Sequence, residues 1–158
     1  MSRTTPATLA LAKAGIVFAV VTYDYDPGAE RVGMQAAEAL GMPPNRVLKT
    51  LMASVDGKPV CVVVPSDREV SMKKLAAAFG GKSAAMMKPA DAERLTGYKV
   101  GGISPFGQRK PVPTAFEEQA LRHAEEVFMN GGQRGLQVRL MASDAVAVLK
   151  AKAAALVA

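Results

Sequence analysis

Residues 97–107, Gly-Tyr-Lys-Val-Gly-Gly-Ile-Ser-Pro-Phe-Gly, constrain the fold of this chain more than any other segment. Four glycines and one proline within this short run exclude a regular helix, so we expect a loop. Adjacent glycines permit positive φ and let a ligand approach the bare backbone, while Pro105 pushes Ser104 into an extended conformation. Such a loop offers backbone N–H groups to a ligand oxygen without requiring a catalytic side chain.

Length and charge set the broad class. We expect a single domain over residues 1–158, which is long enough to bury a core without disulfides. One cysteine excludes an intrachain disulfide and is typical of the reducing cytoplasm, where we place the protein. The apolar stretch 15–21 is too short to span a bilayer, and Lys13 argues against a signal peptide. The net charge of +6 favours a polyanionic partner, nucleic acid first, although solubility alone also explains it.

Caps, turns and hydrophobic periodicity divide the chain into short elements. Helices are predicted at 6–15, 34–40, 71–80 and 89–95, and from 143 onward with Val146, Leu149, Ala153 and Leu156 facing inward. Strands are predicted at 16–23, 47–55, 59–64, 112–116, 126–130 and 135–140. Asp56-Gly57 between two of these strands is a strong hairpin signal.

The order of these elements predicts a fold class. Strands come in hairpin-like clusters with helices between them, which indicates an α/β (α+β) protein with a mixed, largely antiparallel sheet. We expect this sheet to be barrel-like and surrounded by helices. A dinucleotide-binding fold is disfavoured, because no glycine-rich turn follows the first strand and no phosphate-binding lysine motif is present.

Conventional nucleophiles are scarce. His123 is the only histidine and lies in a polar stretch, where a solvated surface position is the simplest interpretation. Cys61 lies among valines and is interpreted as a small buried hydrophobe. With one of each, a Cys–His pair, a metal cluster or a histidine-dependent triad is not supported.

Lys49 is the more informative charged residue. By alternation along its predicted strand it shares a face with Val47, Leu51 and Val55. Its side chain either extends to water at the strand end or is held inward to meet an anion. Thr50 points to the opposite face unless a bulge re-aims it.

Five further cations admit two interpretations, a solvated charged face or a rim that contacts phosphates. They are Lys73, Lys74, Arg109, Lys110 and Arg134. A second glycine turn, 131–135, is explained by a tight hairpin alone.

Three blocks of sequence resemble one known family. They are 47–51 (Val-Leu-Lys-Thr-Leu), 96–108 around the glycine-rich run, and 131–136 (Gly-Gly-Gln-Arg-Gly-Leu). Together with Tyr23 ahead of Asp26-Pro27, they resemble the YbaK/EbsC family of freestanding aminoacyl-tRNA deacylases over nearly the whole chain. That family is related to the editing domain inserted in bacterial prolyl-tRNA synthetases.

The resemblance implies a barrel-like core with surrounding helices and the clearance of mischarged tRNA, above all Cys-tRNA(Pro). It implies substrate-assisted cleavage, in which the thiol of the substrate attacks its own ester and releases tRNA and a thiolactone. No metal or cofactor is implied. Lys49 would contact the terminal ribose or phosphate, and the backbone of 101–105 would hold the aminoacyl group or an oxyanion. The resemblance implies catalytic roles for Lys49, Gly101 and Gly102, and substrate-binding roles for Tyr23, Val32, Thr50, Ile103, Ser104, Pro105, Asn130 and Gln137.

This sequence departs from the family pattern at three positions. Asn130 stands where serine is common, Gln137 where aspartate is frequent, and Val32 where an aromatic is frequent. These changes affect which amino acid on the tRNA the pocket would accept, so alanine or another small amino acid is an alternative to cysteine. A non-catalytic module that binds tRNA or a synthetase is the alternative to an enzyme. The expected partners are the 3′ acceptor end of mischarged tRNA and prolyl-tRNA synthetase, with a monomer as the expected state.

Overall fold

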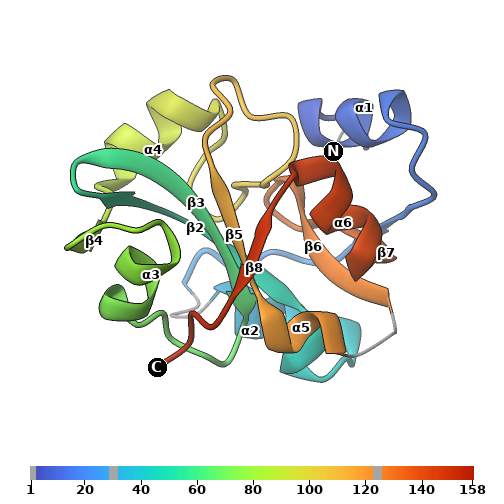
Figure 1. Ribbon diagram of the computed structural model, residues 1–158. Coiled ribbons are helices and arrows are strands. Elements are labelled where there is room, and N and C mark those ends of the chain that lie inside the picture. Colours follow the sequence, from blue (N-terminus) through green and yellow to red (C-terminus); the bar gives the residue numbers. More distant parts are fainter. Residues whose placement is uncertain (1–2, 29–31, 123–125) are drawn as a thin grey trace.

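Two β-sheets with helices packed around them make up the computed structural model, which describes residues 3–28, 32–122 and 126–158 (Figure 1). The helices are α1 (Pro6–Lys13), α2 (Val32–Leu40), the 3₁₀ helix η1 (Pro44–Arg46), α3 (Met72–Ala78), α4 (Pro89–Thr96), α5 (Glu118–Arg122) and α6 (Ala142–Leu149). The strands are β1 (Ala19–Thr22), β2 (Leu48–Val55), β3 (Lys58–Pro65), β4 (Ala84–Met86), β5 (Thr114–Glu117), β6 (Glu126–Gln133), β7 (Leu136–Met141) and β8 (Lys152–Ala154). No helix within the described ranges has the length and apolar character needed to cross a membrane.

The larger sheet is built on the predicted hairpin. Its strand order is β4-β2-β3-β5-β8, with antiparallel pairing around β2 and parallel pairing of β3 with β5 and of β5 with β8. Asp56 and Gly57 join β2 to β3 with φ of 50° and 81°. Positive φ at both central residues is the type I′ signature, whose twist matches that of the strands. The hairpin prediction is confirmed.

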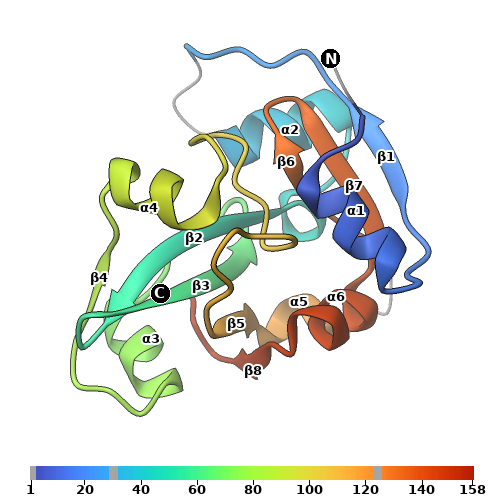
Figure 2. The ribbon, with the colours of Figure 1, turned by 90° about the horizontal axis from the view of Figure 1, so that it is seen from above.

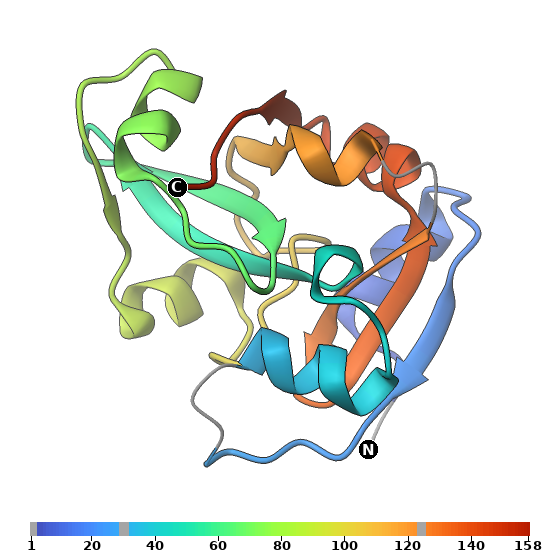
Figure 3. The ribbon, with the colours of Figure 1, turned by 90° about the horizontal axis from the view of Figure 1, so that it is seen from below.

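The smaller sheet has the order β1-β7-β6 and is antiparallel throughout. The two sheets lie next to each other (Figure 3). An isolated parallel bridge pairs Val47, just before β2, with Phe128 of β6. One bridge is not a continuous ladder, so the two sheets do not close on each other. The mixed α/β class and the largely antiparallel pairing are found as predicted, but the barrel-like description is not.

The end of the chain corrects a second expectation. The predicted helix from 143 onward ends at Leu149, because Lys150 adopts a left-handed conformation with φ of 51°. The chain then forms β8, in which Ala153 is exposed, and Leu156 is buried outside any helix. The helical spacing of the apolar residues therefore predicted one continuous helix, whereas the chain forms a helix followed by a short strand.

A buried carboxylate fixes this C-terminal segment. Glu117 is 1% exposed, and its Oε1 accepts hydrogen bonds from the backbone N–H groups of Leu156 (2.8 Å) and Val157 (3.1 Å). Its Oε2 accepts from the N–H of Gln119 (2.9 Å). Three donors from the main chain compensate the burial of the charged group.

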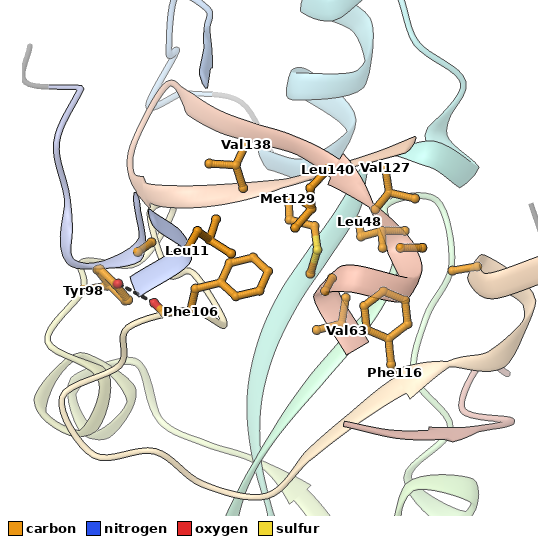
Figure 4. Packing of buried hydrophobic residues seen from close by; sticks show 14 residues of the cluster. Leu11, Leu48, Val63, Tyr98, Phe106, Phe116, Val127, Met129, Val138 and Leu140 are labelled. Carbon is orange, nitrogen blue, oxygen red and sulfur yellow. Dashed lines mark hydrogen bonds between the residues drawn. The ribbon is translucent and has the colours of Figure 1, made fainter. Parts of the chain in front are cut away.

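The main hydrophobic core lies between the two sheets and the helices that flank them (Figure 4). Leu11 of α1, Val63 of β3, Phe116 of β5 and Met129 of β6 are fully buried there. Phe106, from the end of the glycine-rich run, is buried in the same cluster. Burying an aromatic ring of this kind contributes about 2 kcal/mol, so the core anchors one end of the loop.

Glu117→Gln should lower the free energy of unfolding by about 1–3 kcal/mol, because one acceptor oxygen becomes an NH₂ group that faces a backbone donor. Urea unfolding measures the change, with Glu118→Gln as the matched control at the neighbouring carboxylate. Equal stability of the two variants would contradict the role given to Glu117.

Cys61 should be inert in the folded protein. It is 1% exposed, and burial raises the pKa of its thiol to about 12. At pH 8 a thiol with that pKa is ionised to only about 10⁻⁴. Reaction with a disulfide reagent should therefore be negligible in buffer and reach one thiol per chain in denaturant. Complete labelling of the native protein within minutes would contradict this burial.

Candidate functional site

A cavity of about 320 Å³ brings together most of the residues singled out in the sequence. It lies between β2, α4, the glycine-rich run and the paired strands β6 and β7. Its lining comprises Val47, Leu48, Lys49, Thr50, Leu51, Met52, Met86, Met87, Pro89, Ala92, Val100, Gly101, Ile103, Asn130 and Gln137. Apolar side chains make up most of this surface, with a few polar groups among them, as is usual for a small-ligand site.

Lys49 and Thr50 both line this cavity, although they are neighbours on β2. The register of β2 with β3 is regular, so no bulge re-aims Thr50. Instead β4 pairs with β2 only at Ala53–Val55, which leaves residues 48–51, in the described part of the chain, along the edge of the sheet. A cavity along a strand edge is reached from both faces. Alternation therefore could not predict that these two side chains would share it.

The ammonium group of Lys49 keeps access to the cavity and to solvent. Its side chain is 19% exposed, and Nζ lies 3.6 Å from Oε1 of Glu69, a residue whose side chain is 75% exposed. A long ion pair with an exposed carboxylate is weak. The lysine is thus available to an incoming anion.

The glycine-rich run begins where α4 ends. Gly97 closes the helix in a left-handed conformation, and the Tyr98 hydroxyl donates to the Phe106 carbonyl at 2.5 Å. Between these anchors the N–H of Gly102 donates to the Lys99 carbonyl at 2.8 Å. The N–H groups of Gly101 and Ile103 have no hydrogen bond to any described residue. These two, rather than Gly102, are the donors left for a ligand oxygen.

The second glycine turn supports the first. Asn130 Nδ2 donates to the Gly101 carbonyl at 3.1 Å, while its Oδ1 accepts from the N–H of Gly132 at 2.7 Å. Arg134 Nε donates to the Val100 carbonyl at 2.9 Å. A Cβ on Gly102 would lie 2.9 Å from the Arg134 backbone nitrogen, so the two segments approach closer than side chains allow.

Three buried polar atoms near the cavity lack a hydrogen-bond partner in the described chain: Thr50 Oγ1, Gln137 Oε1 and Tyr23 Oη. Burial is the main cause that raises the pKa of the Tyr23 hydroxyl. The nearby Gln137 side chain and Gly135 backbone lower this pKa in part, without the geometry of a hydrogen bond. Each such atom costs about 1–3 kcal/mol unless it finds a partner, so Thr50 Oγ1 and Gln137 Oε1, whose residues line the cavity, are candidate contacts for a ligand there.

Other predicted residues lie apart from the cavity lining. Ser104 is fully buried, and its Oγ accepts from the N–H of Phe106 at 3.1 Å, so it shapes the loop. Pro105 is buried beside it. Val32 begins α2, and its side chain lies outside the described residues, as does His123.

The sequence reasoning did not identify several apolar residues of the lining. Met86, Met87, Pro89, Ala92 and Val100 reach the cavity from β4, α4 and the loop that follows. The short strand β4 carries no periodic signal, since it pairs over only three residues. Within the described ranges no three His, Cys, Asp or Glu side chains gather as metal ligands.

Comparisons with known proteins match this architecture. A family model described as the aminoacyl-tRNA editing domain matches residues 27–147. Over 106 residues the chain is 41% identical to EbsC of Enterococcus faecalis, a proposed Cys-tRNA(Pro)/Cys-tRNA(Cys) deacylase, covering 66% of this chain and 63% of that protein. Over 134 residues it is 25% identical to the multifunctional Ser/Thr-tRNA deacylase ProXp-y of Escherichia coli, covering 85% and 80%.

A solved structure extends the likeness to the whole fold. It is a crystal structure of a proposed trans-editing enzyme for prolyl-tRNA synthetase, with a TM-score of 0.84 and 25% identity over 99% of both chains. Since the family model covers most of its length, this chain belongs to the aminoacyl-tRNA editing domain family.

Proposed function

We propose that this protein is a deacylase that acts in trans on mischarged tRNA and cleaves the ester at the aminoacylated 3′ end. The observation that carries the proposal is the cavity itself. It combines a cation, Lys49, with two uncommitted N–H groups and the unpaired atoms Thr50 Oγ1 and Gln137 Oε1. An ester carbonyl needs donors such as the ammonium, the N–H groups and the Thr50 hydroxyl, while Gln137 Oε1 is an acceptor for a hydroxyl or amino group of the substrate.

Each group has a defined part in this proposal. Lys49 contacts the terminal ribose or phosphate, and the N–H groups of Gly101 and Ile103 stabilise the oxyanion that forms on the ester carbonyl. Thr50 and Gln137 hydrogen-bond the aminoacyl group, with Tyr23 supporting Gln137 from beside it. Asn130 keeps the Gly101 carbonyl fixed, which orients the peptide unit that follows. Val32 is retained as a prediction for the wall of the pocket.

The nucleophile is supplied from outside the protein. The described lining contains no serine, cysteine or histidine, and Cys61 is fully buried behind the lining residues Met52 and Ala92. With a cysteinyl ester, the substrate thiol attacks its own carbonyl and the new C–S bond closes a thiolactone. The C–O ester bond then breaks, and the thiol proton ends on the released ribose oxygen. With other amino acids, water takes the place of the thiol.

We propose cysteine on proline tRNA as the first substrate. EbsC is named for cysteinyl-tRNAs and ProXp-y for seryl- and threonyl-tRNAs, so the related proteins differ in amino acid. Alanine or another small amino acid is the alternative here, because Gln137 offers an amide where the family pattern has a carboxylate. We propose a cytoplasmic monomer of one domain, with prolyl-tRNA synthetase as a candidate partner.

A panel of Cys-, Ala-, Ser-, Thr- and Pro-charged tRNAs tests the proposal. At least one mischarged ester should decay faster than its spontaneous rate. Lys49→Ala should lower kcat/KM on that ester by about 10- to 100-fold, the value of a charged hydrogen bond of about 1.5–3 kcal/mol. Lys152→Ala, an exposed lysine on β8, is the matched control. Binding without cleavage of any ester would select a non-catalytic tRNA-binding module instead.

Gly101→Ala should lower the deacylation rate by about 10²–10³, the usual cost of losing an oxyanion donor. Its Cβ would lie 2.7 Å from the Tyr25 hydroxyl, at a φ of 89° that side chains rarely adopt. Gly80→Ala is the control, because Gly80 also has positive φ (68°) but open space around its Cβ position. Urea unfolding of both variants separates the strain of a side chain at positive φ, which they share, from the extra contact with Tyr25 at position 101. Equal deacylation rates of the two variants would contradict a role of the glycine-rich loop in the reaction.

A further inference from the structure

A second, larger depression lies beside the cavity. It has a volume of about 800 Å³ and is bounded by the β2–β3 hairpin, the segment after β4, helix α4 and residues 109–110. Figure 2 shows β2, β3, β4 and α4 on the same side of the molecule. We call this depression the α4 groove. Its lining includes the cations Lys88, Arg94, Arg109 and Lys110 and one carboxylate, Asp91.

Most of the positive charge in the α4 groove is uncompensated. Arg94 forms an ion pair with Asp91 one turn away on α4. Lys88, Arg109 and Lys110 are exposed, and none forms an ion pair with any residue that the structure describes. The groove therefore presents a net surplus of three positive charges to a ligand.

The backbone fixes two of these cations in place. The N–H of Arg109 donates to the Thr96 carbonyl at 2.9 Å, and the N–H of Lys110 donates to the Leu95 carbonyl at 3.2 Å. These bonds satisfy carbonyls in the last turn of α4 and hold the segment against the helix. The main chain at 109 and 110 thus has a defined position beside α4, from which the two exposed side chains extend.

The groove and the cavity are neighbours. Met86 and Met87 line both of them, and Met86 is 49% exposed. Helix α4 separates the two spaces, with Pro89 and Ala92 on the cavity side and Arg94 on the groove side. A ligand whose reactive end enters the cavity would pass over the methionines into a positively charged channel.

We propose that the α4 groove binds the phosphodiester backbone of the unpaired nucleotides that precede the aminoacylated one. This inference rests on the proposed function, because it concerns the same substrate. The ligand must be covalently continuous with the ester in the cavity and carry regularly spaced negative charge, and a single-stranded RNA end has both properties. The exposed Met86 side chain gives the bases an apolar surface to pack on.

The remaining cations of the predicted phosphate rim are placed elsewhere. Lys74 Nζ donates to the Val157 carbonyl at 2.8 Å, and the Arg134 guanidinium lies 5.6 Å from the centre of the Tyr25 ring. Lys73 is on α3 and does not line either space. Of the five cations, Arg109 and Lys110 belong to the groove.

The test measures binding of an uncharged RNA minihelix with an unpaired 3′ end, by fluorescence anisotropy over a range of salt. In the triple variant Lys88→Gln/Arg109→Gln/Lys110→Gln, the slope of log K against log salt should become less steep by about 2. Each of the three lost phosphate contacts on a single strand accounts for about 0.7 of this change. The control Lys13→Gln/Lys73→Gln/Lys152→Gln removes the same charge elsewhere and should keep the slope. A blunt minihelix should show no difference between the two variants.

Three results with RNA would overturn the proposal. They are an unchanged salt slope in the groove variant, an equal change of slope in the control variant, or an equal loss of affinity for the blunt minihelix. Binding of a polyglutamate peptide that is as tight and as sensitive to the groove variant would also overturn it, in favour of an acidic protein partner. An aminoacyl ester of adenosine alone separates this inference from the proposed function. The wild type and the groove variant should cleave it equally, since it has no phosphate. If the wild type cleaves no ester, the deacylase proposal fails and the salt slopes still decide the groove.

Discussion

The close approach of two glycine-rich segments holds the candidate site together. The loop at Gly101-Gly102 lies against the turn at 131–135 with no room for side chains between the backbones. Asn130 and Arg134 then tie the turn to the loop by hydrogen bonds to two successive carbonyls. The carbonyls of Val100 and Gly101 are bound by this turn, whereas the N–H groups of Gly101 and Ile103 have no hydrogen bond to any described residue. Main-chain groups therefore contribute to the polar character of the cavity beside the polar side chains that line it.

This arrangement suits a reaction in which the protein positions an ester rather than attacks it. Lys49, Thr50 and Gln137 surround the cavity with one cation and two unsatisfied polar atoms, and the described lining is otherwise mainly apolar. Hydrogen-bond donors that are already in place strengthen each contact to a developing oxyanion. The same scaffold would serve different amino acids, which is consistent with relatives named for cysteinyl-tRNAs and for seryl- and threonyl-tRNAs.

Local signals in the sequence predicted the parts of the fold that depend on local chemistry. Asp56-Gly57 specified its turn, Thr5 and Ser71 cap the helices predicted to follow them, and the glycine-rich run is irregular as expected. The remaining features of the fold depend on contacts between residues that are far apart in the sequence. Sheet closure depends on how β2 meets β6, and the segment after β8 is held by the Glu117 carboxylate. The site was predictable as a set of motif residues, but the placement of Thr50 on a strand edge and of Met86 and Met87 in the lining required the tertiary structure.

A crystal structure with a hydrolysis-resistant 3′-aminoacylamino analogue of adenosine tests most directly whether this cavity receives the aminoacylated 3′ end. The account predicts the analogue's carbonyl oxygen within hydrogen-bond distance of the Gly101 or Ile103 nitrogen. It also predicts the amino-acid moiety against Thr50 and Gln137, and the ribose near Lys49. An analogue bound elsewhere on the protein, with Thr50 and Gln137 still unpartnered, would contradict the account.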